Sequence, residues 1–139
     1  MATPCHIIVE GNPAILYASR NGTPAKVLPR LNKFLDIFSE ERETAGEYCD
    51  TPECLLAQVV VRFGFEICED DFSNLRVGIH YHPDVEYLYS IASDYSVTIW
   101  QAEAQYRQNP SQGLQACRQV ASEVMAENAK VTGLRASDR

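Results

Sequence analysis

Apolar and polar positions follow one another along the chain with spacings that predict a succession of strands and helices. Residues 5–10 are mostly apolar and rich in β-branched side chains, which predicts a strand. Residues 14–19 predict a second strand, and the cluster Gly11-Asn12-Pro13 between them predicts a turn. The chain therefore begins with a predicted hairpin, which Asn21-Gly22 ends.

The next segment carries the pattern of an amphipathic helix, with apolar residues at three- and four-residue spacing over 27–38. Thr23 fits its N-cap, and Pro24 fits its first position, where a missing N–H costs nothing. Its other face is basic, with Lys26, Arg30 and Lys33. Pro29 leaves two alternatives open, because a proline beyond the first turn clashes with a preceding carbonyl. Either the helix starts near Leu28 or it is kinked at Pro29.

Residues 39–50 are predicted to be an acidic connector, after which Thr51-Pro52-Glu53 repeats the cap-and-proline signal. The stripe of this second helix is Leu55, Leu56, Val59, Val60 and Phe63. Apolar and polar residues also alternate over 61–68, which is the period of a strand. We interpret the segment as helix to about Phe63 and extended chain after it.

Three stretches of strict alternation follow, at 75–82, 87–92 and 95–100, separated by Pro83-Asp84 and Ser93-Asp94. Such alternation is typical of an antiparallel meander with one packed face and one wetter face. It predicts three consecutive strands that pair with one another.

The last predicted element is a helix over 109–125, which opens with Asn109-Pro110 and ends before Gly133. The order of elements is thus β-β-α-α-β-β-β-α. It predicts an α+β fold in which an antiparallel sheet of about five strands has helices packed on one face. We expect a single domain over 1–133 and a frayed tail over 134–139.

Composition places the chain among ordinary globular domains, with 139 residues of which 45% are apolar and 22% charged. Neither an export signal nor a membrane-length apolar run is visible. The number of cysteines, five, is odd, which argues against a framework of disulfides. We therefore expect a soluble, cytoplasmic protein with reduced thiols and no cofactor. The net charge is −7, and residues 36–71 alone sum to −9, with eleven acidic residues and two arginines. This charge disfavours nucleic acids and anionic membranes and suits a basic protein partner.

His80 and His82 are the sharpest candidates for chemistry. Two residues apart in a predicted strand, they would point to one face and could reach one metal ion, with Asp84, Cys68 or His6 as a further ligand. The alternative is that they lie on the solvated face of an edge strand. The common nucleophile and nucleotide-binding motifs do not occur, so no catalytic residue is assigned and an enzyme is the less favoured expectation.

Aromatic and acidic residues suggest an interface. The tyrosines of the meander share their predicted faces with apolar residues, and most of them are expected in the core: Tyr81, Tyr87, Tyr89 and Tyr95. Trp100 falls on the opposite face, either as an exposed interface anchor or beneath the last helix. The other predicted interface residues are Glu40, Glu41, Glu43 and Glu47.

Residues 16–24, followed by Val27-Leu28-Pro29, resemble a motif of small uncharacterised bacterial and phage proteins. In that group a strand passes through a Gly-aromatic-Pro turn into a helix, and a later hairpin resembles residues 84–89. The likeness covers a third of the chain, and this sequence departs from the pattern at Ser19-Arg20-Asn21 and at Thr23. The resemblance implies a small accessory protein linked to mobile elements, with no known activity to transfer.

The absence of catalytic motifs and the acidic segment together favour a non-enzymatic protein-binding or regulatory module, such as an inhibitor or accessory protein. The first alternative is a small-ligand or metal-binding protein, conceivably an enzyme, that uses His80 and His82. The second is a homodimer that pairs strand edges or the face of its last helix.

Overall fold

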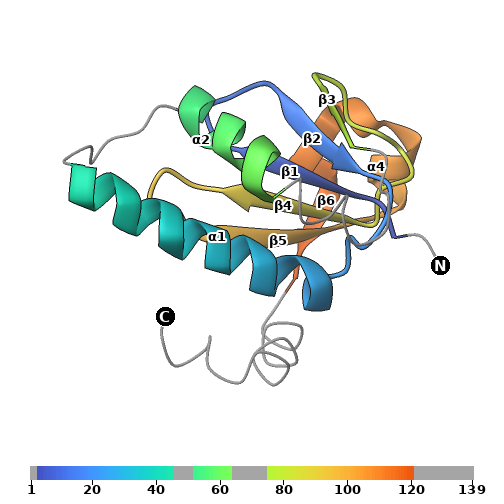
Figure 1. The fold of residues 1–139 in the computed structure, drawn as a ribbon. Helices are drawn as coiled ribbons and strands as arrows, with labels where there is room; N and C mark the ends of the chain where they lie inside the picture. The colour runs from blue at the N-terminus through green and yellow to red at the C-terminus, as the bar shows by residue number, and fades with distance from the viewer. Residues whose placement is uncertain (1–2, 46–51, 64–74, 121–139) are drawn as a thin grey trace.

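A mixed six-stranded sheet forms the centre of the protein (Figure 1). The computed structural model describes residues 3–45, 52–63 and 75–120. The strands are β1 (Cys5–Val9), β2 (Ile15–Ala18), β3 (Arg76–Gly78), β4 (Tyr87–Ile91), β5 (Val97–Ala102) and β6 (Cys117–Gln119). They lie in the order β3-β2-β1-β4-β5-β6, in which β1 and β4 are parallel and the other neighbours antiparallel.

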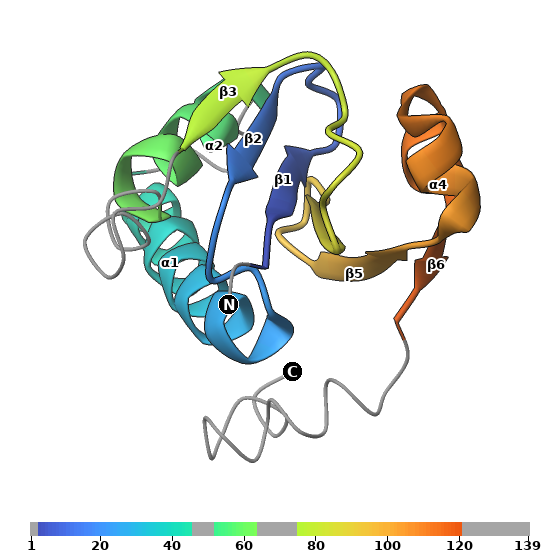
Figure 2. The same ribbon diagram turned by 90° about the vertical axis from the view of Figure 1, so that its right-hand side faces the viewer.

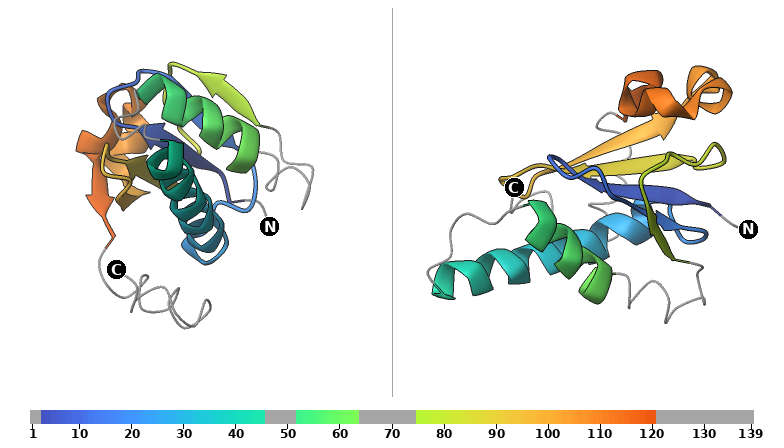
Figure 3. Two further views of the ribbon diagram at one scale, coloured as in Figure 1. Left: turned by 60° about the vertical axis from the view of Figure 1, so that its left-hand side comes forward. Right: turned by 90° about the horizontal axis from the view of Figure 1, so that it is seen from above.

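Helical segments cover both faces of this sheet (Figures 2 and 3). On the first face lie α1 (Pro24–Ala45), α2 (Pro52–Gln58) and the π-helical segment η1 (Val59–Phe63). On the second face α4 (Ala104–Gln108) and the 3-10 segment η2 (Pro110–Ala116) lie beside β5 and β6. The α+β prediction is confirmed, whereas the prediction of helices on one face only is wrong. Within the described ranges, no helix has the length and apolar character needed to cross a membrane.

The predicted stripe of α1 packs against the first face and forms the larger core. Its residues Val27, Leu28, Leu31, Phe34, Leu35 and Phe38 are all buried. The backbone N–H groups of Lys26 and Val27 donate to the Thr23 carbonyl at 3.0 and 2.9 Å, so Thr23 starts the helix. Pro29 therefore lies inside α1, and the alternative start near Leu28 is excluded.

The helix α1 is longer than predicted, because residues 39–45 continue it rather than form a connector. These residues are polar and carry no apolar stripe, so periodicity alone could not assign them. Glutamate and arginine are nonetheless good helix formers. Residues 46–50 of the predicted connector, including Glu47, lie outside the described part of the chain.

The second predicted helix is confirmed over 52–63, where α2 passes directly into η1. Leu55, Leu56 and Val59 of its stripe are buried in the same core. The extended segment predicted after Phe63, through residue 68, lies outside the described residues and stays a prediction.

The predicted three-stranded meander is wrong. Of the three predicted strands, only β4 and β5 pair with each other as a hairpin. The strand β3 pairs instead with β2, and β4 lies parallel to β1. Period-two alternation tells which face a side chain takes but not which strand lies next to it. The first strand of the meander is also shorter than predicted, because β3 ends at Gly78 and Ile79 is 66% exposed.

The predicted helix over 109–125 is also wrong as far as residue 120. After Asn109-Pro110 the chain makes the short η2 and then enters β6. Gly113 has a φ of 61°, which is left-handed backbone, and a Cβ at this position would lie 3.0 Å from the Tyr81 ring. This turn against Tyr81 kinks η2, and the chain enters β6 at Cys117. Residues 121–139, with the rest of the predicted stripe and the tail, lie outside the described ranges, so the domain boundaries stay a prediction.

The tyrosines of the meander divide between two cores. Tyr89 is fully buried under α1, and Tyr87 and Tyr95 pack against the same core. Tyr81 packs instead against a smaller core on the second face, with Tyr106 and Trp100. The prediction that they share faces with apolar residues holds for β4, but Tyr81 lies beyond the end of β3.

Candidate functional site

A row of polar and aromatic side chains crosses the second face of the sheet. Alternation along β1 turns Cys5 and Ile7 toward α1 and His6 toward the second face. In register, His6 lies opposite Tyr17 of β2 and Leu88 of β4. The loop between β3 and β4 brings residues 79–86 to this row.

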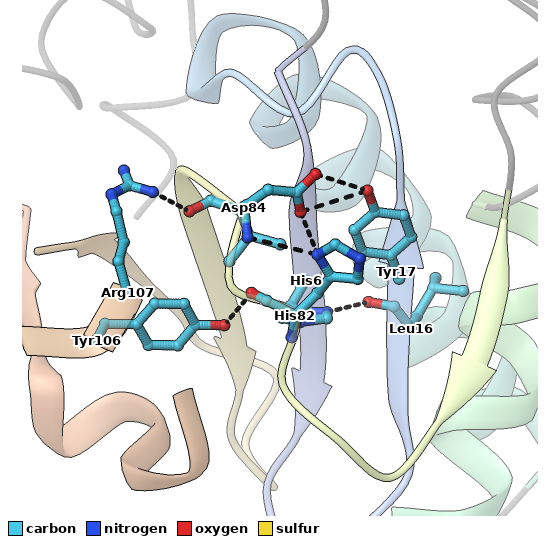
Figure 4. Close-up of polar contacts among 8 residues, drawn as sticks. His6, Leu16, Tyr17, His82, Asp84, Tyr106 and Arg107 are labelled. Atoms are coloured by element: carbon cyan, nitrogen blue, oxygen red, sulfur yellow. Dashed lines mark hydrogen bonds and ion pairs between the residues drawn. The ribbon is translucent and has the colours of Figure 1, made fainter. Parts of the chain in front are cut away.

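His6 is a buried structural group, with 1% of its surface exposed. Its Nε2 accepts the backbone N–H of His82 at 2.8 Å, so the ring proton is on Nδ1, which lies 3.3 Å from the Leu16 carbonyl oxygen (Figure 4). Burial lowers the pKa of His6 to about 4. The ring is therefore neutral near pH 7, and both of its nitrogens are engaged.

The backbone of His82 is held from two elements far apart in sequence. Its N–H donates to His6 of β1, and its carbonyl accepts the hydroxyl of Tyr106 of α4 at 2.7 Å. Burial raises the pKa of Tyr106, so this hydroxyl keeps its proton and stays a donor. Both hydrogen bonds orient the loop at His82.

The side chain of His82 is oriented as well. Its ring stacks on Tyr17 with centroids 4.8 Å apart and planes at 28°. Its Nδ1 is in close contact with the Asp84 carboxylate. The backbone N–H of Asp84 also points at this Nδ1, from 3.4 Å; we place a proton on Nδ1 because the carboxylate, which can only accept, is the closer of the two partners. Within the described residues Nε2 of His82 has no hydrogen-bond partner, and it is the nitrogen left for a ligand.

Tyr17 joins the imidazole to the carboxylate. Its hydroxyl donates to both Asp84 oxygens at 3.4 and 3.5 Å, which are long hydrogen bonds. Burial, followed by the charge of Asp84, raises the pKa of Tyr17, so the hydroxyl is protonated. The side chains of His82 and Asp84 are 38% and 52% exposed, so the pair is open to solvent while its support is buried.

Two guanidinium groups lie near this pair. The Arg76 guanidinium carbon is 5.0 Å from the Tyr17 ring centroid, and Arg107 Nη1 donates to the Val85 carbonyl at 3.3 Å. Tyr17 and Arg107 lie on opposite sides of Asp84 in Figure 4. One guanidinium therefore lies against Tyr17, which stacks on His82, and the other lies at the backbone next to Asp84.

The metal hypothesis for His80 and His82 rested on a strand through both residues, and β3 ends before them. His80 is exposed, whereas His82 is anchored in the row. Of the further ligands considered, His6 and Asp84 do lie next to His82, but both ring nitrogens of His6 are engaged; Cys68 lies outside the described residues. No group of three or more His, Cys, Asp or Glu residues in the described part of the chain could hold a metal ion.

The predicted interface residues do not form one surface. Trp100 is half-buried on the second face and donates from Nε1 to the Ser90 hydroxyl at 3.1 Å. Glu40, Glu41 and Glu43 are exposed on the last turns of α1, which covers the first face. The two groups lie on opposite sides of the sheet and cannot bind one small surface of a partner.

No protein-family model, curated protein or solved structure matches the chain. The resemblance of residues 16–29 and 84–89 to small uncharacterised proteins stays a prediction.

Proposed function

We propose that the protein binds a small polar ligand at the His82–Asp84 pair and that Nε2 of His82 exchanges a proton with it. One observation carries this proposal: His82 is held at its N–H, its carbonyl, its Nδ1 and its ring face, and Nε2 has no partner in the part of the chain that the structure describes. A carboxylate that holds one imidazole nitrogen orients the other for proton transfer. Histidine is the side chain best suited to that task near neutral pH.

The ligand class follows from the neighbouring groups. No serine, threonine or cysteine of the described chain is hydrogen-bonded to His82, which favours a proton on the ligand or on water over a protein nucleophile. The guanidinium groups of Arg76 and Arg107 favour a ligand with an anionic group, such as a phosphate ester or a carboxylic acid.

Titration with inorganic phosphate, followed by amide NMR shifts, tests the ligand site. We expect the largest shifts at Tyr17, His82 and Asp84, and we expect a His82→Ala variant to lose them. His80→Ala is the matched control, because His80 is exposed and outside the pair. Shifts that survive His82→Ala, or that are absent for phosphate and acetate alike, would contradict the proposal.

Chemical modification tests the open nitrogen directly. Diethyl pyrocarbonate acylates neutral imidazole, so at neutral pH it should modify His82 and the exposed His80 but spare His6, whose nitrogens are both engaged. Peptide mass spectrometry after brief exposure locates the adducts. An unreactive His82 in the folded protein would show that Nε2 is covered.

The protein-binding hypothesis is a second candidate and has support of its own. Glu40, Glu41 and Glu43 lie exposed on a rigid helix rather than in a loop. Charges on such a support steer association with a partner of opposite charge.

A further inference from the structure

The exposed side of α1 has its charges divided by sign. Lys26 and Lys33 lie in its first half, and Glu40 and Glu43 lie in its second half. Between the two halves lie Ile37, which is 43% exposed, and the exposed Asp36. Figure 3 shows α1 running along one face of the sheet.

This arrangement opposes the helix macrodipole. A helix is stabilised by acidic residues at its N-terminus and by basic residues at its C-terminus. The first turn of α1 contains no acidic residue, and Arg42 is the basic residue of its last turn, among several glutamates. The division of charge therefore does not stabilise the isolated helix and calls for another reason.

The spacing of the charges supplies that reason. Lys26, Lys33 and Glu40 are seven residues apart, so they follow one line along α1, and Ile37 belongs to the adjacent line. Lys33 and Glu40 lie at equal distances, in opposite directions along α1, from the point midway between residues 36 and 37.

We infer that α1 binds the α1 of a second copy of this chain in antiparallel orientation. A two-fold axis at the midpoint places Lys33 of each copy against Glu40 of the other, with the two Ile37 side chains in contact between these pairs. The acidic half of each helix then lies beside the basic, N-terminal half of its partner. This compensates the unfavourable dipole of both helices. The inference specifies the partner of the second candidate function and is independent of the His82 site.

The strength of this dimer follows from its contacts. Exposed ion pairs contribute little each, and one isoleucine per copy buries a small apolar area. We therefore expect weak, reversible association that is stronger at about 20 mM salt than at about 0.5 M salt, where the charges are screened.

Reversing the charge of Lys33 or Glu40, which form the ion pairs next to the proposed axis, tests the inference. Lys33→Glu places four glutamates at the axis and Glu40→Lys places four lysines there, so each variant alone should dimerise roughly tenfold more weakly or worse. An equimolar mixture of the two variants should form a heterodimer, because every contact then joins a lysine to a glutamate. The double variant Lys33→Glu/Glu40→Lys should dimerise like the unmodified chain. Sedimentation at low salt measures all four samples.

Glu53→Lys is the matched control, because it makes the same change of charge at an exposed position on α2. It should leave association unchanged. Folding of each variant is checked by circular dichroism, and recovery of the dimer on mixing itself shows that both single variants are folded. A monomeric unmodified chain at low salt, or a mixture that stays monomeric, would overturn the inference and leave the phosphate titration at His82 unaffected.

Discussion

Lowering the pH from about 7 to about 4 is expected to reduce the free energy of unfolding by about 3 kcal/mol through His6 alone. Burial lowers the pKa of His6 from 6.5 to about 4, so the folded protein excludes a proton that the unfolded chain accepts. The stability associated with a neutral His6 is complete above the unfolded pKa of 6.5. It is lost as the pH falls through the window between 6.5 and about 4.

The burial that lowers the pKa of His6 also gives this residue its structural role. His6 is surrounded by the sheet and the loop at residues 79–86, and its Nε2 must stay unprotonated to accept the His82 N–H. Protonation of Nε2 would leave this new N–H of His6 facing the N–H of His82, and two buried donors without an acceptor between them reduce the stability of the fold. Acid should therefore loosen the loop that presents His82 before the larger core under α1 unfolds.

Urea unfolding at a series of pH values measures this effect. The variant His6→Gln keeps an acceptor and a donor but does not titrate, so its stability should change less between pH 6.5 and 4 than that of the unmodified chain. His80→Gln is the matched control, because it removes an exposed histidine and should leave the slope unchanged. An equal slope in all three proteins would place the titration elsewhere than at His6.

The parts of the fold predicted from sequence are those that local spacing determines. The stripe of α1 needs only the positions of neighbouring apolar residues, and every member of it is buried as predicted. The hairpin of β4 and β5 was also predictable, because a tight turn at Ser93-Asp94 joins two alternating segments. In both elements the interacting residues are close in sequence.

The parts that were missed depend on contacts between distant residues. The insertion of β1 between β2 and β4 brings Cys5 beside Tyr87, and no local pattern records that neighbour. The short β6 follows a turn that Gly113 makes against Tyr81, a residue 32 positions earlier in the chain by their numbers. Capping and periodicity signals at Asn109-Pro110 could not reveal this contact.

The candidate site shows the same division. His82 was singled out together with His80 as a possible metal ligand, because the two stand two residues apart in a predicted strand, and Asp84 was named only as one possible further ligand. Tyr17 and Tyr106 were not recognised as parts of the site, although one stacks on His82 and the other holds its carbonyl. Each comes from a different element, and only the mixed sheet brings them to one face. Sequence reasoning therefore named His82 and Asp84 among candidate metal ligands and missed the groups that orient them.

Gly22→Ala is expected to reduce the free energy of unfolding by about 3 kcal/mol, through overpacking and lost hydrogen bonds. A Cβ at Gly22 would clash with the backbone oxygen of Thr3 and would lie 2.7 Å from the Cβ of Cys5, which is completely buried. The chain must shift at a point where the Gly22 N–H donates to Thr3 at 2.8 Å and the Gly22 carbonyl accepts the buried Tyr89 hydroxyl at 2.6 Å.

The matched control is Gly78→Ala in the edge strand β3, where nothing lies within 4 Å of the added carbon. Neither glycine has a positive φ, so the comparison isolates steric fit from backbone strain. Alanine at position 78 should change stability by less than about 1 kcal/mol, and in the stabilising direction, because it restricts the unfolded chain. Urea unfolding of both variants measures the difference. Equal stability of the two would mean that the N-terminal segment moves aside freely, and that the Gly22 contacts contribute little to the attachment of β1 to α1.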